Sequence, residues 1–190
     1  MNDTQVIIVG AGPVGLTLSL ALADLGISCI LLEKNDAPSG LPKMERCNAR
    51  TMEIYRRLGI VDELRAAGLP EDCPMDVFVV TRLVDEPILR LPYGSVKECK
   101  QDIATHNDGT RTLEPYQLIS QYTLEPLLKK FAEQSEYIDV RFGHEFIRFD
   151  DQGDHVSVQA RKTDGTAVTL TGDYLVGCDG GASPVRKQLG

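Results

Sequence analysis

A glycine-rich turn near the N-terminus carries the strongest chemical signal in the sequence. The residues Gly10-Ala11-Gly12-Pro13-Val14-Gly15 fit the pattern G-x-G-x-x-G. In this pattern the first glycine permits a tight turn, the second lets the backbone approach a pyrophosphate, and the third lets a helix lie close to a strand. The free N–H groups and the dipole at the start of that helix would face the anion. The turn therefore predicts a site for the diphosphate of a dinucleotide.

An acidic residue follows at a distance typical of such sites. Glu33 lies 18 positions beyond Gly15, at the expected end of a second strand, where it can accept hydrogen bonds from an adenosine ribose. An anionic side chain there also disfavours a ribose 2′-phosphate. The alternative is a glycine turn that binds nothing, and the strand, helix and acid together argue against it. These residues alone do not decide between NAD and FAD.

The flanking segments predict the elements that would hold these residues in place. Residues 6–9 and 29–32 are short buried strands, and the apolar segment 16–25 between them is a helix that ends at Gly26, which makes a βαβ unit. Helices are also expected over 51–58, around 62–67 and over 120–134, where Pro126 is tolerable only near the start. Weaker signals predict strands at 77–80 and 88–91, with no indication of how they pair.

The C-terminal part of the sequence has a different pattern of predicted elements. Short strands at 145–149, 156–160 and 168–170, separated by turns, predict an antiparallel meander. A buried strand over 174–178 then reaches Asp179-Gly180-Gly181, and Ser183-Pro184 is typical of a helix start. Because an NAD domain would usually continue with βαβ units, the meander favours FAD. The expected fold class is α/β, a Rossmann-like FAD-binding βαβ core with a parallel sheet plus an antiparallel β-meander.

Composition and charge exclude several classes of function. The 190 residues include 20 Lys and Arg against 28 Asp and Glu, and the net charge of −8 argues against a nucleic-acid partner. No stretch reaches the roughly 20 apolar residues that span a bilayer, so no membrane partner is expected. The N-terminus lacks a secretory signal, which makes the cytoplasm the expected location. The five cysteines and three histidines lack the spacing of disulfide or metal sites, so we expect reduced thiols and no metal.

Three segments together resemble the FAD-dependent aromatic-ring hydroxylases, the single-component flavoprotein monooxygenases of the phenol hydroxylase type. They are the glycine turn with Glu33, the stretch 42–53, and the stretch 174–186, in which an Asp-Gly pair precedes Ser-x-x-Arg. The family links that last fingerprint to flavin and nicotinamide cofactors. Segment 119–127 resembles the family helix whose glutamine, here Gln121, contacts the flavin side of FAD. Lys43 stands where the family usually has arginine, and lysine keeps the charge without the bidentate geometry.

The resemblance implies an enzyme in which NAD(P)H reduces FAD and O₂ supplies the oxygen transferred to a small phenolic substrate. Since the flavin carries that chemistry, no catalytic side chain is expected in this part of the protein. The family's Gly-Asp fingerprint for the ribityl chain and most of the substrate sheet are absent, which predicts a truncated, inactive N-terminal portion with an incomplete substrate domain. The cofactor contacts are expected at Gly10, Gly12, Pro13, Val14, Gly15, Glu33, Lys34, Lys43, Gln121, Asp179 and Gly180.

The expected domains are an FAD-binding βαβ unit with its following helices over 1–73, partial substrate-domain strands over 74–115, and a return to the FAD-binding domain over 116–190. Two alternatives stay open: another FAD-dependent enzyme on the same fold, such as a halogenase or reductase, and a non-catalytic nucleotide-binding fragment. Asp179 has the alternative of capping a buried strand. The sequence does not reveal the aromatic substrate, the position hydroxylated, the choice between NADH and NADPH, or whether the protein is a homo-oligomer.

Overall fold

A computed structural model describes residues 2–38, 40, 42–106 and 108–190. The chain falls into two compact units. The first unit comprises residues 1–42 and 124–190, and the second comprises residues 43–123.

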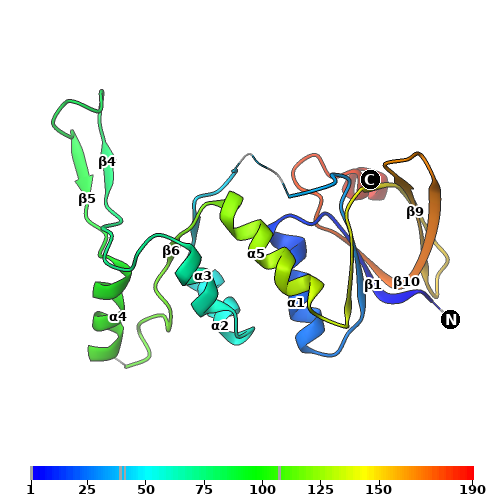
Figure 1. Cartoon of the computed structure of the whole chain (residues 1–190), viewed down its shortest axis with the longest axis horizontal. Helices are drawn as coiled ribbons and strands as arrows, with labels where there is room; N and C mark the ends of the chain where they lie inside the picture. The colour runs from blue at the N-terminus through cyan, green and yellow to red at the C-terminus, as the bar shows by residue number, and fades with distance from the viewer. Residues whose placement is uncertain (1, 39, 41, 107) are drawn as a thin grey trace. The chain divides into compact units, whose positions relative to one another are not determined.

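The first unit is built on one mixed six-stranded sheet (Figure 1), with the strand order β7-β2-β1-β10-β9-β8. The strands β7, β2, β1 and β10 run parallel to one another, whereas β9 runs antiparallel to both β10 and β8. The expected parallel core and meander are therefore confirmed, as two halves of the same sheet. The strands are β1 (Thr4–Val9), β2 (Cys29–Leu32), β7 (Ile138–Arg141), β8 (His144–Asp151), β9 (Val156–Lys162) and β10 (Ala167–Gly177).

The meander covers one face of the parallel strands. Ile7 and Leu32 pack in one buried cluster with Phe146 and Val158 of the meander. Ile8 faces the other way, because side chains alternate along a strand, and it is also fully buried. This burial on both faces explains why the strands read as continuous apolar runs. The meander occupies the face that a further helix would cover in a standard doubly wound fold.

Helices complete the first unit. The helix α1 (Pro13–Asp24) packs against β1, β2 and β7. The helix α5 (Gln121–Glu133) begins at the end of the second unit, continues into the first (Figure 1), and buries Leu124 and Leu128 one turn apart. Pro126 is the sixth residue of α5, so the expectation that it would be tolerated only near the start was too strict. The short helix α6 (Pro184–Leu189) follows β10.

Two strands predicted separately are in fact one. The segment 168–170 and all of 174–178 except its last residue belong to β10, which pairs with β9 in its first half and with β1 in its second. Gly172 lies at the change of partner, where an added Cβ would be 3.0 Å from Cγ1 of Ile7. The strand β7, by contrast, was not predicted, because four residues of alternating polarity give little signal.

In the described residues of the second unit, three complete helices and two pairs of short strands precede the start of α5. Its core includes Met52, Tyr55 and Leu64, none of which is more than 1% exposed. The predicted strands at 77–80 and 88–91 form an antiparallel hairpin, whose large apolar side chains are mostly exposed. The elements are β3 (Arg46–Cys47), α2 (Ala49–Arg57), α3 (Val61–Ala67), β4 (Val77–Val79), β5 (Leu89–Leu91), α4 (Val96–Thr105) and β6 (Gln117–Leu118).

The helix α4 was missed by the sequence analysis. Its signal is a capping box, in which the Ser95 side chain accepts from the backbone of Glu98 and the Glu98 side chain accepts from the backbone of Ser95. The pattern S-x-x-E was visible in the sequence. The helix itself buries little apolar surface, so its hydrophobic periodicity is weak.

Candidate functional site

The glycine turn has the geometry that its sequence predicts. Gly10 has a φ of +103°, and an added Cβ would lie 2.5 Å from the carbonyl oxygen of Cys178 and 2.9 Å from Cα of Asp179. A Cβ on Gly15 would overlap the carbonyl oxygen of Gly10. The first and third glycines are therefore required for the tight turn and for the close approach of α1 to the strands.

The second glycine leaves the start of α1 open. Gly12 is the N-cap residue, and no side chain caps the helix among the described residues. The nearest heavy atom to an added Cβ is Oε1 of Glu125, 3.9 Å away. Because Pro13 has no N–H, the orphan donors of the first turn are the amides of Val14 and Gly15. An open, uncapped helix start next to a residue without a side chain is suited to an anion.

Glu33 is placed directly beside this turn. Its Oε2 accepts a hydrogen bond from the backbone N–H of Ala11 at 3.0 Å. Its Oε1 accepts from the backbone N–H of Asn35 at 3.0 Å and from the Asn35 side-chain amide at 2.6 Å. The carboxylate is thus fixed at the edge of the turn. The sequence analysis did not single out Asn35, whose only signal is an amide side chain two residues after the acid.

The Asp-Gly pair lies against the same turn. The carboxylate of Asp179 accepts from the backbone N–H of Val185 at 3.1 Å, and Ser183 accepts from the N–H of Arg186 at 2.9 Å. Asp179 therefore accepts from the first turn of α6, the helix that follows it, rather than capping the strand that precedes it. Gly180 has a φ of +81° with open space around its Cα, so a role for this pair in cofactor binding stays a prediction.

Lys43 and Gln121 meet each other in the second unit. The side-chain oxygen of Gln121 accepts from the backbone N–H of Lys43 at 2.8 Å, and the backbone N–H of Gln121 donates to the carbonyl of Met44 at 3.0 Å. Gln121 is buried, with 7% of its surface exposed, although it is polar and begins a helix. Lys34 is exposed beside Glu33.

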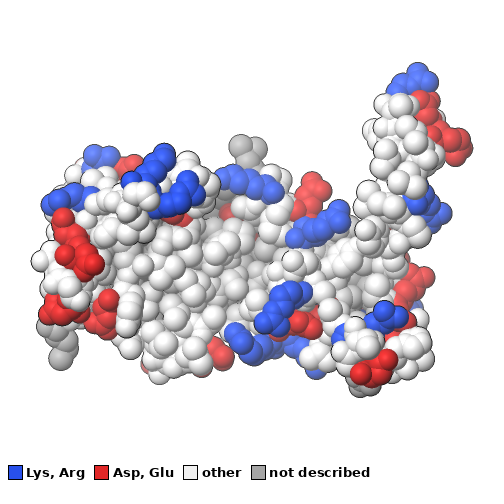
Figure 2. Space-filling model, turned by 180° about the vertical axis from the view of Figure 1, so that it is seen from behind, with Lys and Arg blue, Asp and Glu red and all other residues white. Residues whose placement is uncertain are grey.

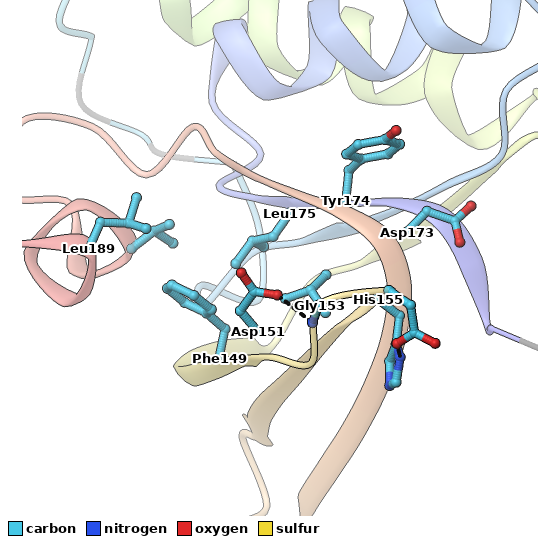
Figure 3. Close-up of a pocket in the computed structure, with 11 residues that line it drawn as sticks. Phe149, Asp151, Gly153, His155, Asp173, Tyr174, Leu175 and Leu189 are labelled. Atoms are coloured by element: carbon cyan, nitrogen blue, oxygen red, sulfur yellow. Dashed lines mark hydrogen bonds and ion pairs between the residues drawn. The ribbon is translucent and has the colours of Figure 1, made fainter.

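A separate hollow lies on the meander side of the first unit. A pocket of about 540 Å³ opens between the β8–β9 turn, β10 and α6 (Figure 3). Phe149, Tyr174 and Leu189 contribute apolar surface, and Asp151 and His155 line it as well. It shares no residue with the predicted cofactor contacts.

The cysteines are free thiols. Burial raises the pKa of Cys29 and of Cys47 to about 11. Burial and the nearby Asp179 raise the pKa of Cys178, which follows β10 and lies close to Gly10, so this thiol stays uncharged at neutral pH. Among the residues that the structure describes, no group of three or more His, Cys, Asp or Glu could hold a metal ion, and no helix could cross a membrane.

Known proteins share both this sequence and this fold. Residues 3–190 match the family model described as FAD binding domain. The chain is 36% identical over 192 residues to the FAD-dependent monooxygenase apdD of Emericella nidulans, which covers 100% of this chain and 31% of that protein. It is 31% identical over 191 residues to phenol 2-monooxygenase of a Pseudomonas species, covering 99% of this chain and 30% of that protein.

Solved structures agree. The ternary complex of aklavinone-11 hydroxylase with FAD and aklavinone matches with a TM-score of 0.86 and 27% identity, over 100% of this chain and 35% of that one. The chain thus spans about a third of the length of the relatives that it matches. The predicted fold class and the resemblance to flavoprotein hydroxylases are confirmed. Since the family match extends over residues 3–190, the chain belongs to the FAD binding domain family, whose members among its relatives include FAD-dependent monooxygenases.

Proposed function

We propose that this chain is the FAD-binding part of an NAD(P)H-dependent monooxygenase that hydroxylates a small aromatic, phenolic substrate with O₂. The observation that carries the proposal is the Glu33 carboxylate, held 3.0 Å from the backbone nitrogen of Ala11 in the glycine turn. This contact puts an acceptor for ribose hydroxyls next to donors for a diphosphate. Adenosine diphosphate, which forms one half of FAD, carries both groups in that order.

The residues of the first unit fit that half of FAD. The uncapped amides at the start of α1 would bind the diphosphate, and Gly12 leaves the space that a Cβ would fill. Glu33 would accept from the adenosine ribose. When bound, FAD supplies the redox chemistry that uses NAD(P)H and O₂. We assign further contacts to Pro13, Lys34, Lys43, Gln121, Asp179 and Gly180, and no catalytic role to any residue of this chain.

The exposed hairpin supports an assignment to a substrate domain. Leu83, Val84 and Ile88 are 96%, 87% and 70% exposed, and the hairpin stands out from the second unit with oppositely charged side chains near its tip (Figure 2). An isolated two-stranded hairpin is marginally stable in water, so it needs further strands or another surface. We propose residues 74–115 as part of the substrate domain, with 1–73 and 116–190 as the FAD-binding domain, in a protein that acts in the cytoplasm.

The first experiment measures FAD binding by the purified chain and by the variant Gly12→Ala. A methyl group at position 12 has room in the protein but occupies the path of the diphosphate, so we expect FAD affinity to fall by about tenfold or more, as for the loss of one hydrogen bond to a charged group. Gly40→Ala is the matched control, because an added Cβ there meets nothing within 4 Å. Equal affinities of the two variants would contradict the proposed diphosphate site.

The second experiment addresses the reaction. A full-length protein that contains this chain is expected to purify yellow and to oxidise NAD(P)H faster when a phenol is added. A yellow protein whose NAD(P)H oxidation no phenol stimulates would contradict the hydroxylase assignment while leaving FAD binding intact.

A further inference from the structure

The acceptor sites of the Glu33 carboxylate are nearly filled by the protein itself. A carboxylate has two oxygens and about four acceptor positions. Oε1 receives two donors, the backbone N–H and the side-chain amide of Asn35. Oε2 receives one donor, the N–H of Ala11. Counting donors from the described residues alone, one acceptor position remains, and it is on Oε2, the oxygen that faces the glycine turn.

From this count we propose that Asn35 is a positioning residue for the ribose site. It holds Glu33 through Oε1, so that only Oε2 is presented to the sugar and a single ribose hydroxyl is taken by the carboxylate. The inference rests on the proposed function, since it requires an adenosine ribose at Glu33. It goes further by naming a residue that sets how that ribose is recognised.

The backbone around Asn35 is clamped by the distant meander. The N–H of Gly143 donates to the carbonyl of Asn35 at 2.9 Å, and the N–H of His144 donates to the carbonyl of Glu33 at 2.8 Å. Next along the chain, the hydroxyl of Thr163 donates to Asp36 at 2.7 Å. The backbone that carries Asn35 is therefore held in place by residues more than 100 positions away. The side-chain amide of Asn35 thus approaches Glu33 from a fixed position.

A purely structural explanation makes a different prediction. Asn side chains often bond to nearby groups to end a strand or form a turn, and such a role would affect only folding. A positioning role would change how strongly the protein distinguishes a ligand with ribose hydroxyls from one without them. The two explanations therefore separate in a measurement of ligand discrimination.

The experiment compares ADP with 2′,3′-dideoxy-ADP, and uses FAD to confirm the site. For each protein we measure the dissociation constant of the dideoxy analogue divided by that of ADP. The proteins are the 190-residue chain and its variants Asn35→Ala and Asn35→Asp. Both variants lack the amide donor, and the aspartate variant keeps the size of the side chain. The matched control is Asn2→Ala, because the Asn2 amide also donates to a carboxylate, Asp173, at 2.7 Å on the surface. Thermal unfolding of each variant reports on folding.

The unaltered chain and the Asn2 variant should bind ADP about tenfold or more tightly than the dideoxy analogue, as expected for one hydrogen bond to a charged group. In both Asn35 variants the backbone N–H groups still contact the carboxylate but the amide no longer fixes it, so the ratio should fall by about threefold or more. A ratio that survives in the Asn35 variants would overturn the positioning role and leave the proposed function standing. A chain that binds neither FAD nor ADP would overturn both.

Separate 2′-deoxy and 3′-deoxy forms of ADP test the single-hydroxyl claim. In the unaltered chain one of these analogues should bind like ADP and the other like the dideoxy form. Equal losses for both analogues would show that the carboxylate holds both hydroxyls, and would overturn that part of the inference.

Discussion

The substitution Glu33→Gln tests the carboxylate that accepts hydrogen bonds beside the glycine turn. Three protein donors converge on this carboxylate, from Ala11 and Asn35. A glutamine side chain has the same shape but offers one oxygen, and its NH₂ group must then face either the N–H of Ala11 or the donors of Asn35. At least one donor therefore points at another donor in place of an acceptor.

The magnitude follows from that mismatch. A hydrogen bond to a charged group contributes about 1.5–3 kcal/mol, and an unsatisfied partner costs about 1–3 kcal/mol when buried. Because Glu33 is half-buried, water offsets part of the loss, and we expect the free energy of unfolding to fall by about 1–2 kcal/mol. For a chain of this length that lowers Tm by about 2–8 °C. FAD affinity should fall about tenfold as well, since the ribose loses a charged acceptor.

Thermal unfolding without ligand and titration with FAD measure the two effects separately. Glu136→Gln is the control, because it makes the same change of charge at an exposed position of the first unit. If Glu33→Gln matched this control in both Tm and FAD affinity, Glu33 would not join the turn to the ribose, and the reasoning from its contacts would be wrong. A drop in Tm with unchanged FAD affinity would keep the structural contact and reject the ribose role.

Two further predictions concern other parts of the chain. Burial raises the pKa of Cys29 and Cys47 from 9.0 to about 11, so the folded state holds these protons more tightly than the unfolded state, and the free energy of unfolding should fall as pH rises from about 9 through about 11. Urea unfolding at several pH values in this range measures how steeply the free energy of unfolding falls with pH. This slope should be smaller in the double variant Cys29→Ala, Cys47→Ala. An unchanged slope would show that the two thiols do not cause the pH dependence. On the hairpin, the double substitution Leu83→Ser, Val84→Ser should change the free energy of unfolding by less than about 0.5 kcal/mol, because both side chains are exposed. Thermal unfolding should therefore give a Tm close to that of the unaltered chain, while binding of an apolar dye falls. A large drop in Tm would mean that these side chains are buried in the folded chain.

Local patterns were sufficient for the elements around the glycine turn. The apolar β-branched run 6–9, the glycines and the apolar run 29–32 each carry their own signal, and β2 was predicted with its observed bounds. The meander was also visible from its turns. These elements are set by short-range periodicity and by residues that favour turns.

Other features depend on contacts that no local pattern encodes. The strand β7 exists because Ile138–Arg141 pairs with β2, and the pairing partner lies more than 100 residues earlier. Gln121 is polar and near a helix start, which suggests a solvated position, yet it is buried and its side chain accepts from the backbone N–H of Lys43, 78 residues away. The role of Asn35 could likewise not be predicted from its sequence neighbours, because it depends on the position of Glu33 beside the glycine turn.

The register of three parallel strands is what brings the fingerprints of the first unit together. Val9 pairs with Leu32 on one side and with Gly177 on the other, so Gly10, Glu33 and Cys178 each follow at the same edge of the sheet. The N–H of Gly10 donates to the carbonyl of Leu32 at 2.7 Å, and the N–H of Cys178 donates to the carbonyl of Val9 at 2.7 Å. A slip of one residue in either pairing would shift Glu33 or Asp179 by about 3.3 Å and reverse the direction of its side chain. The buried faces of these strands forbid such a slip, because it would turn Ile30 and Leu32 away from the cluster that they share with Phe146. The apolar core therefore fixes the position of the acidic residue relative to the glycine turn, and a substitution in that core that loosens the register should weaken nucleotide binding without touching the site.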